Sequence, residues 1–182
     1  MSEPLLVPQV GPQDKPKVDA IFAAVEERMG FVPDALKLYS LSPALLESFL
    51  GVIGYFSTES PLGPRLAAMI RYLGSYRANC TFCIDLNEGY LTSMGLDLDD
   101  IRRAREDIDA APLEPNEMPL LRLAMKSTSM PETVSAADIE ACRTAGWDDR
   151  AIFEAVVHAT NNRAFNQLLS TFKVEHQGAY AA

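Results

Sequence analysis

Apolar residues recur along the first part of the chain at spacings of three and four, which is the period of an α-helix. The first run has Pro16 before it and Gly30 after it, and its members are Val18, Ile21, Phe22, Val25 and Met29. Proline is favoured in the first turn of a helix, and glycine is favoured just beyond its last turn. The pattern therefore predicts a first helix that ends at Gly30.

Two further apolar runs have the same period. One begins after Ser42-Pro43, extends to about Tyr55 and comprises Leu45, Leu46, Phe49, Val52, Ile53 and Phe56. Residues 57–64, with two prolines and a glycine, separate it from a run of Leu66, Met69, Ile70 and Leu73. No segment alternates apolar and polar residues between turns, as a half-buried strand does. The sequence predicts an all-α fold.

Two later segments repeat one pattern at equal spacing. In each segment an aspartate follows two residues after a glycine, as Gly95 with Asp97 and Gly146 with Asp148. Glycine adopts the left-handed conformation that ends many helices, and aspartate caps the free amides of the next helix. Both segments are predicted to be corners between two helices.

The length and composition are those of one globular domain. The chain has 182 residues, 48% of them hydrophobic and 23% charged, and we expect one domain over residues 1–182 with an irregular arm at residues 1–14. No apolar run is long enough to cross a bilayer, and the acidic, proline-rich start does not resemble a secretory signal. The net charge of -9 disfavours contact with nucleic acid. We expect a cytoplasmic protein without membrane or nucleic-acid partners.

A pair of cysteines, Cys80 and Cys83, closely follows the third predicted helix. On a helix these two residues and Asn87 share one face, so the two sulfurs can meet. A thiol in the first turn faces free amides and the positive end of the helix dipole, which lower its pKa, and a thiol three residues on can close a disulfide. The spacing predicts a thiol redox site. The alternative is a pair of inert buried cysteines.

The third cysteine and the two histidines do not extend this pair into a metal site. Zinc needs two more ligands, and Cys142, His158 and His176 lack the spacing of a zinc finger. We expect no metal and no cofactor. Cys142 belongs to a separate predicted helix and is expected to be structural.

The segment from Leu66 to Gly95, with Asn79-Cys80-Thr81-Phe82-Cys83 at its centre, resembles the signature region of the alkylhydroperoxidase D-like (AhpD-like) branch of the carboxymuconolactone decarboxylase family. Flanking segments, among them Phe31-Val32-Pro33 and Ala145-Gly146-Trp147, are similar to those of its peroxidase-related members. The resemblance covers about residues 15–174. It implies a multihelical antiparallel bundle that forms a homo-oligomer and reduces a peroxide through the cysteine pair, with an unknown thiol as the reductant.

The sequence departs from the family pattern at the proton relay. Asn87 stands where the peroxidases of the family have a histidine, and Ala68 stands where they have a glutamate. Asparagine can orient a neighbouring group but takes up no proton near neutral pH, and alanine does neither. The residues considered for a supporting role are Asn87, Tyr72 one turn beyond Ala68, and His158, which we expect at the surface beside Glu154.

Several questions stay open at this stage. Arg71 and Arg77 carry charges that would stabilise a thiolate, but both are expected to be solvated. The helix position favours Cys80 as the attacking thiol, whereas the family pattern assigns the attack to Cys83. The leading function is a thiol-dependent peroxidase with a weakened site. The alternatives are a non-redox decarboxylase of the same fold and a redox-responsive protein without turnover. Independently, the apolar circumference of the second predicted helix predicts a homo-oligomer.

Overall fold

The computed structural model describes residues 5–174, and 71% of these residues are helical. No strand occurs in this range, so the prediction of an all-α fold is confirmed. The helices are α1 (Lys15–Met29), α2 (Asp34–Tyr39), α3 (Pro43–Thr58), α4 (Pro64–Arg77), α5 (Thr81–Ser93), α6 (Leu98–Arg103), α7 (Met118–Ser129), α8 (Ala136–Thr144) and α9 (Asp149–Phe172). Two short 3-10 turns, η1 (Ile108–Ala110) and η2 (Pro131–Thr133), precede and follow α7.

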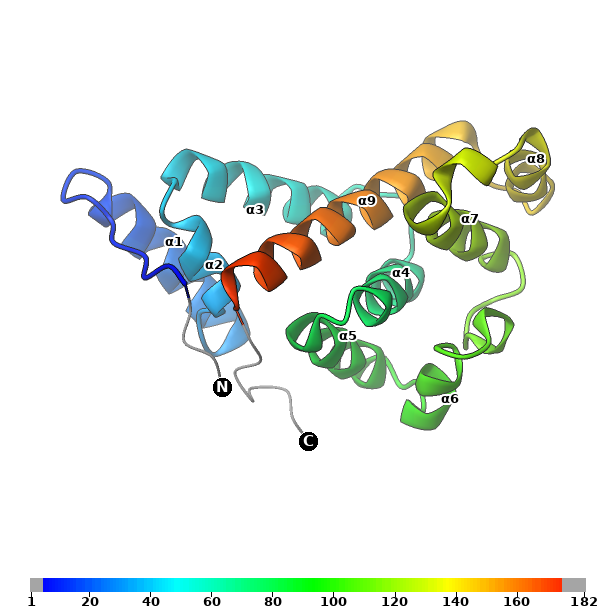
Figure 1. Cartoon of the computed structure of the whole chain (residues 1–182), viewed down its shortest axis with the longest axis horizontal. Helices are drawn as coiled ribbons and strands as arrows, with labels where there is room; N and C mark the ends of the chain where they lie inside the picture. The colour runs from blue at the N-terminus through cyan, green and yellow to red at the C-terminus, as the bar shows by residue number, and fades with distance from the viewer. Residues whose placement is uncertain (1–4, 175–182) are drawn as a thin grey trace.

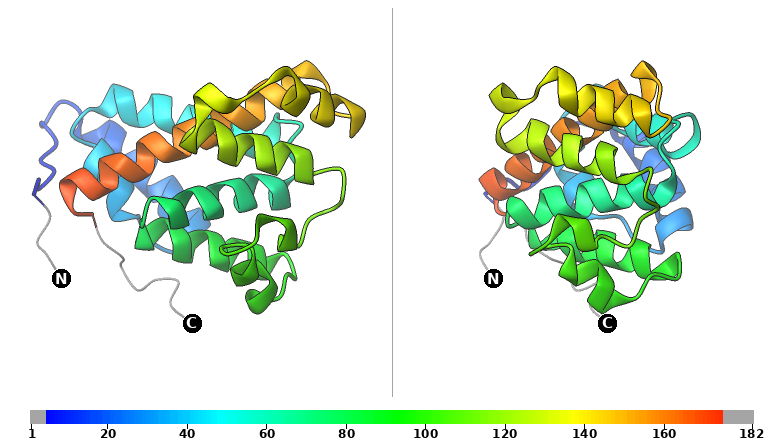
Figure 2. Two further views of the ribbon diagram at one scale, coloured as in Figure 1. Left: turned by 45° about the vertical axis from the view of Figure 1, so that its right-hand side comes forward. Right: turned by 90° about the vertical axis from the view of Figure 1, so that its right-hand side faces the viewer.

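Helix α4 lies at the centre of the bundle and packs against α5, α7 and α9 (Figure 1). The long helix α9 runs across the molecule, with α1 and α2 near one end and α8 near the other (Figure 1). Figure 2 shows α4 and α5 side by side, with α7 and α9 on the other side of α4. Helix α4 therefore has neighbouring helices on several sides.

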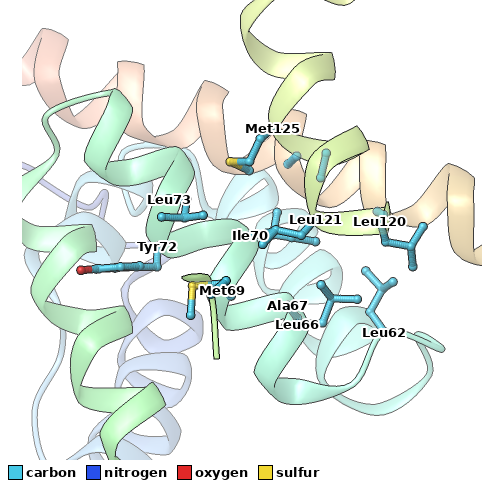
Figure 3. Close-up of a cluster of buried hydrophobic side chains, with 14 of the residues drawn as sticks. Leu62, Leu66, Ala67, Met69, Ile70, Tyr72, Leu73, Leu120, Leu121 and Met125 are labelled. Carbon is cyan, nitrogen blue, oxygen red and sulfur yellow. The ribbon is translucent and has the colours of Figure 1, made fainter. Parts of the chain in front are cut away.

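The core explains this central place, because eight of the fourteen residues of α4 are buried. Figure 3 shows Leu66, Ile70 and Leu73 of α4 in one cluster with Leu121 and Met125 of α7. Burial of apolar surface is the main stabilising contribution to such a bundle. A helix buried on several sides also carries its polar side chains into the interior, where each one needs a hydrogen-bond partner.

The sequence located the helix ends well. Gly30, Gly95 and Gly146 have φ angles of 81°, 85° and 98°, in the left-handed region that ends a helix. The carboxylates of Asp97 and Asp148 accept hydrogen bonds from backbone amides of the first turns of α6 and α9. Both predicted corners are confirmed.

The pattern missed two helices. Neither α2 nor α7 was predicted, since α2 has six residues and α7 follows a loop rich in proline and acidic residues. Residues 5–14 form turns and irregular chain before α1, and residues 1–4 lie outside the described range. Within that range, no helix is both long and apolar enough to cross a membrane.

Candidate functional site

The turn between α4 and α5 places Cys80 at the start of α5. After α4 ends at Arg77, Asn79 adopts a left-handed conformation with φ 52°, which asparagine tolerates better than most residues. The backbone N–H of Cys80 then donates to the carbonyl of Ser75, 3.0 Å away. Cys80 is therefore the N-cap residue of α5, and Cys83 is the third residue of that helix.

Cys80 and Cys83 are free thiols, with 5% and 2% of their surface exposed. The two side chains hydrogen-bond each other, and the backbone N–H of Cys83 also donates to the Cys80 sulfur. These hydrogen bonds outweigh burial and lower the pKa of Cys80. The pKa of Cys83 is raised, first because its proton is shared with the Cys80 sulfur and then because of burial. Cys80 is thus the thiol that ionises first.

An apolar layer covers the cysteine pair. The buried residues that pack with the two cysteines come from α2, α5 and α9 and are Ala35, Phe82 and Leu169. Phe165 of α9 packs against this cluster and stacks on Phe49 of α3, with ring centroids 4.9 Å apart. Phe49 stacks in turn on Tyr39, at 4.4 Å. The surroundings of the thiols are therefore aromatic and contain little water-accessible surface.

Asn87 contacts the backbone of α5 and not a sulfur. Its Nδ2 donates to the carbonyl of Cys83 at 2.7 Å, and its Oδ1 accepts from Nε of Arg71 at 2.9 Å. The pairing of Arg71 with Asn87, together with that of Ser75 with Cys83, shows that α4 and α5 run antiparallel. Asn87 fixes the guanidinium of Arg71 beside the second cysteine and takes no part in proton uptake.

Arg71 is the functional residue that the sequence misjudged, since the expectation of a solvated side chain is wrong. The side chain is half-buried, and its charge acts to lower the pKa of Cys83, against the larger effects that raise it. Burial lowers the pKa of Arg71 itself. The cause is the position of Arg71 on a helix with neighbours on several sides. Arg77 is exposed, as expected, and donates to the carbonyl of Met125 at 3.2 Å.

The expected surface position of His158 is also wrong, because only 6% of this residue is exposed. Its Nε2 lies 3.1 Å from Nη1 of Arg71 and 3.2 Å from the carbonyl of Ala67, and its ring packs on Phe56 with centroids 4.4 Å apart. Helix α9 contacts α3 as well as α4 and α7, so the face opposite its apolar stripe is buried too, including Glu154 at 5%.

The surroundings of His158 decide its protonation state. Burial, and then the charge of Arg71, lower the pKa of His158 to about 4. A guanidinium only donates and a carbonyl only accepts, so Nε2 bonds to Arg71 in one tautomer and to Ala67 in the other, and the low pKa keeps the ring neutral in both. A neutral imidazole with so low a pKa is a weak base. His158 is close to the thiol site but does not replace the missing proton relay.

Tyr72 lies in a different polar cluster from the cysteines. Its hydroxyl donates to Glu88 at 2.9 Å and accepts from Nε of Arg105 at 2.6 Å. Burial and the neighbouring carboxylate raise the pKa of Tyr72. The tyrosine is therefore neither near the thiols nor able to act as a base there. Ala68, where the family pattern has glutamate, is fully buried.

Ser75 is a contact of the second cysteine that the sequence did not indicate. It hydrogen-bonds the Cys83 side chain and acts to lower the pKa of that thiol, although burial and Cys80 outweigh this effect. Its Oγ also accepts from Nδ2 of Asn166 at 3.2 Å. The antiparallel pairing of α4 and α5 was the available signal, because it sets Ser75 against Cys83 across the turn.

The remaining candidates lie elsewhere. Cys142 is fully buried in the main core, where burial raises its pKa to about 11. No three His, Cys, Asp or Glu side chains of residues 5–174 lie close enough to hold a metal ion, and His176 is outside that range. A groove of about 450 Å³ lies between α3 and α9, and neither Cys80 nor Cys83 lines it.

Comparisons with known proteins define the class of fold. No family model matches the sequence, and no curated protein matches it. A peroxidase-related protein from Silicibacter sp. TM1040 superposes with a TM-score of 0.88 at 21% identity, over 99% of this chain and 95% of the other. A peroxidase-related protein with an AhpD core from Ralstonia eutropha JMP134 gives a TM-score of 0.82 at 18% identity, over 98% and 96%.

A third neighbour has a different named activity. The debrominase Bmp8, in complex with 2,3,4-tribromopyrrole, superposes with a TM-score of 0.79 at 16% identity, over 100% of this chain and 96% of its own. Together the three neighbours show that the chain has the AhpD-like fold. The resemblance inferred from the cysteine motif is confirmed at the level of fold.

Proposed function

We propose that this protein is a cytoplasmic thiol-dependent peroxidase that cycles Cys80 and Cys83 between dithiol and disulfide. The observation that carries the proposal is the asymmetry of the pair. The pKa of Cys80 is lowered by hydrogen bonds from Cys83, and Cys83 keeps its proton within reach of the first sulfur. The names of two structural neighbours support a peroxidase, and a reducing compartment would keep the thiols free.

The chemistry needs one thiolate and one thiol. The Cys80 thiolate attacks the terminal oxygen of a hydroperoxide, the O–O bond breaks, and the alkoxide that leaves takes a proton from solvent. Cys80 is then a sulfenic acid. The Cys83 thiol attacks the Cys80 sulfur, a disulfide forms, and water leaves. A dithiol reductant restores both thiols by thiol–disulfide exchange and becomes a disulfide itself.

Turnover is expected to be slow. General acid–base catalysis contributes typically a factor of about 100 to 10,000, and neither Asn87 nor Ala68 can supply it. His158 has a pKa of about 4 and contacts Arg71, so it does not collect the proton of Cys80. The hydrogen bonds from Cys83 and the position of Cys80 at the helix N-terminus remain to support the thiolate.

The test begins with a stoichiometric reaction of the reduced full-length protein with hydrogen peroxide. We expect two thiols to be lost for each peroxide, and peptide mass analysis to find Cys80 joined to Cys83 with Cys142 free. Peroxide consumption with dithiothreitol then compares the wild type with Cys80→Ser, Cys83→Ser and the matched control Cys142→Ser. The first two variants should lose turnover and the third should keep it. Equal rates in the wild type and Cys83→Ser would overturn the mechanism.

A reductive debromination is the second candidate, favoured by the aromatic layer over the thiols and by the debrominase among the neighbours. Oxidation of the dithiol supplies the two electrons that replace a C–Br bond by C–H, with release of bromide and a proton. Bromide release from 2,3,4-tribromopyrrole, measured beside peroxide loss, separates the two reactions. An activity that survives serine at both cysteines would instead indicate a non-redox decarboxylase-like enzyme, and a disulfide without turnover a redox-responsive protein.

We also propose that the chain forms a homo-oligomer through α3. Leu45, Val52 and Ile53 on this helix are 57%, 41% and 43% exposed, and Phe153 of α9 beside them is 67% exposed. Covering these side chains with a second copy would remove apolar surface from water. Analytical ultracentrifugation should give a mass above that of one chain, and Phe153→Glu should reduce it. A monodisperse monomer of the wild type would contradict this proposal.

A further inference from the structure

Arg71 differs from the other arginines of the described chain because it neither contacts a carboxylate nor is exposed to solvent as a whole. Six arginines contact a carboxylate, namely Arg102, Arg103, Arg105, Arg122, Arg143 and Arg150. Four others are exposed to solvent, namely Arg28, Arg65, Arg77 and Arg163. Arg71 is half-buried, and no carboxylate of residues 5–174 lies within 4.0 Å of its guanidinium. It is a half-buried cation with no carboxylate partner among the described residues.

The two side chains that contact the guanidinium of Arg71, an amide and an imidazole, carry no negative charge. Nε donates to the amide oxygen of Asn87, and Nη1 lies 3.1 Å from Nε2 of His158. The Cys83 side chain and the hydroxyl of Tyr90 are close enough to interact with its charge. Nη2 donates to no group of the described residues, and no polar side-chain atom that is fully buried there lacks a hydrogen-bond partner. Nη2 therefore reaches solvent with its protons free.

A partly buried guanidinium without a negative partner destabilises the protein, and a bound anion would remove this destabilisation. Charges taken out of water are stable in proteins when they are paired, and an unpaired one costs several kcal/mol. The chain has 25 acidic residues, yet none of the described ones is placed here. The guanidinium presents its free donors in a plane that matches the oxygens of a carboxylate or a phosphate, and the aromatic rings nearby favour the carboxylate of an organic acid.

We propose that Arg71 binds the carboxylate of a small organic acid, held beside Cys83 at the junction of α3, α4, α5 and α9. Asn87 and His158 fix the guanidinium, so its free Nη2 edge faces the ligand. The ring of Phe56 packs on His158, and Tyr90, which is 40% exposed, is close enough to interact with the charge of Arg71. They give the apolar part of the acid a surface to contact.

If the protein has the function proposed above, this site also defines its substrates as hydroperoxides or halides that bear a carboxylate. That extension rests on the proposed function, whereas the binding of the acid does not. The two are separated by measuring binding in a variant with serine at both Cys80 and Cys83. Binding retained there supports the carboxylate site even if no peroxide is ever consumed.

The probe is benzoate, titrated calorimetrically into the reduced full-length protein, with benzamide as the neutral molecule of the same shape. We expect benzoate to bind about tenfold or more tightly than benzamide, because a hydrogen bond to a charged group is worth roughly 1.5–3 kcal/mol. Arg71→Gln should weaken benzoate binding by about the same factor, and Arg71→Lys should weaken it less because the charge remains. The matched control is Arg77→Gln, six residues further along α4, which should bind like the wild type.

Three results would overturn the proposal. The first is the absence of any benzoate binding by the wild type at millimolar concentration. The second is equal affinity of the wild type and Arg71→Gln, or of the wild type and Arg71→Met if the glutamine variant does not fold. The third is equal binding of benzoate and inorganic phosphate, both lost in Arg71→Gln, which would make the site a general anion site and not one for organic acids.

Discussion

Helices α4 and α5 carry two polar clusters. The two have the same pairing of residues between the helices, but they differ in whether their charges are paired. Arg71 bonds to Asn87 in one cluster, and Tyr72 bonds to Glu88 in the other, so neighbouring residues of α4 meet neighbouring residues of α5. Because adjacent helix positions point about 100° apart, the clusters lie on different sides of the helix pair. Only the Arg71 cluster adjoins the cysteines.

In the Glu88 cluster the negative charge is paired with positive charges. Arg102 reaches both carboxylate oxygens, at 3.1 and 2.9 Å, and Arg105 and Tyr72 bond to Oε1. Burial alone would raise the pKa of Glu88, but the hydrogen bonds from Arg102 and Tyr72 outweigh it and lower the pKa. The Arg71 cluster contains a cation, a neutral imidazole, an amide and two thiols. The first cluster stabilises the packing of α4, α5 and α6, and the second keeps a charge available for chemistry.

The largest effect should come from breaking the Glu88 cluster. Glu88→Gln removes the charge that Arg102 and Arg105 share and should lower the free energy of unfolding by about 3 kcal/mol. Arg71→Gln should change it by about 1 kcal/mol or less, because loss of an unpaired charge offsets the lost hydrogen bonds. Urea unfolding followed by circular dichroism measures both. A larger loss for Arg71→Gln than for Glu88→Gln would contradict the comparison.

The free energy of unfolding at acidic pH should show whether His158 is held neutral in the folded protein. Its folded pKa of about 4 lies below the ordinary value of 6.5, so the unfolded chain takes up the proton first. This contribution to stability is complete above about pH 6.5 and is lost as the pH falls towards 4, by up to about 3 kcal/mol at 1.36 kcal/mol per unit. Urea unfolding at each pH should show a steeper loss in the wild type than in His158→Asn. Parallel curves would mean that His158 is not held neutral.

The sequence predicted the parts of this molecule that depend on local chemistry. The corners at Gly95 and Gly146 follow from the left-handed conformation of glycine, and the place of Cys80 at a helix start follows from the end of the preceding apolar run. Both predictions rest on residues within a few positions of one another. A single sequence shows directly which residues are neighbours along the chain, so features that depend on such neighbours can be predicted from it.

The predictions for Arg71 and His158 were wrong for one shared reason. Both side chains lie opposite the main apolar stripe of their helix, and a stripe predicts solvent on the other side only when a single face is buried. Helices α4 and α9 are buried on more than one face, because α9 crosses α3, α4 and α7. Contacts between distant parts of the chain decide which helices cross. The apolar pattern of a single helix therefore does not predict how many of its faces are buried.

Peroxide turnover should respond to a new base on the cysteine side of α5. Asn87→His places an imidazole next to Cys83 and Arg71 and should raise peroxide consumption with dithiothreitol about tenfold, which is less than the usual general-base effect because Arg71 disfavours the protonated ring. Adding Ala68→Glu should raise it further if the buried site admits the carboxylate. Thr92→His, exposed on the same helix, is the control and should have no effect. A rapid wild-type enzyme would show a proton relay elsewhere.

The smallest expected effect is the difference in thiol reactivity. Iodoacetamide should modify Cys80 several times faster than Cys83 near pH 7, since the pKa of the first thiol is lowered and that of the second is raised. Fragmentation of the labelled peptide distinguishes the two sites. Arg71→Gln should widen the difference, because the charge of Arg71 is one of the few influences that lower the pKa of Cys83. Glu88→Gln should leave it unchanged, because Glu88 contacts neither thiol. If both variants change the ratio equally, the two clusters are coupled through α5, and the cysteine site is not electrostatically independent of the Glu88 cluster.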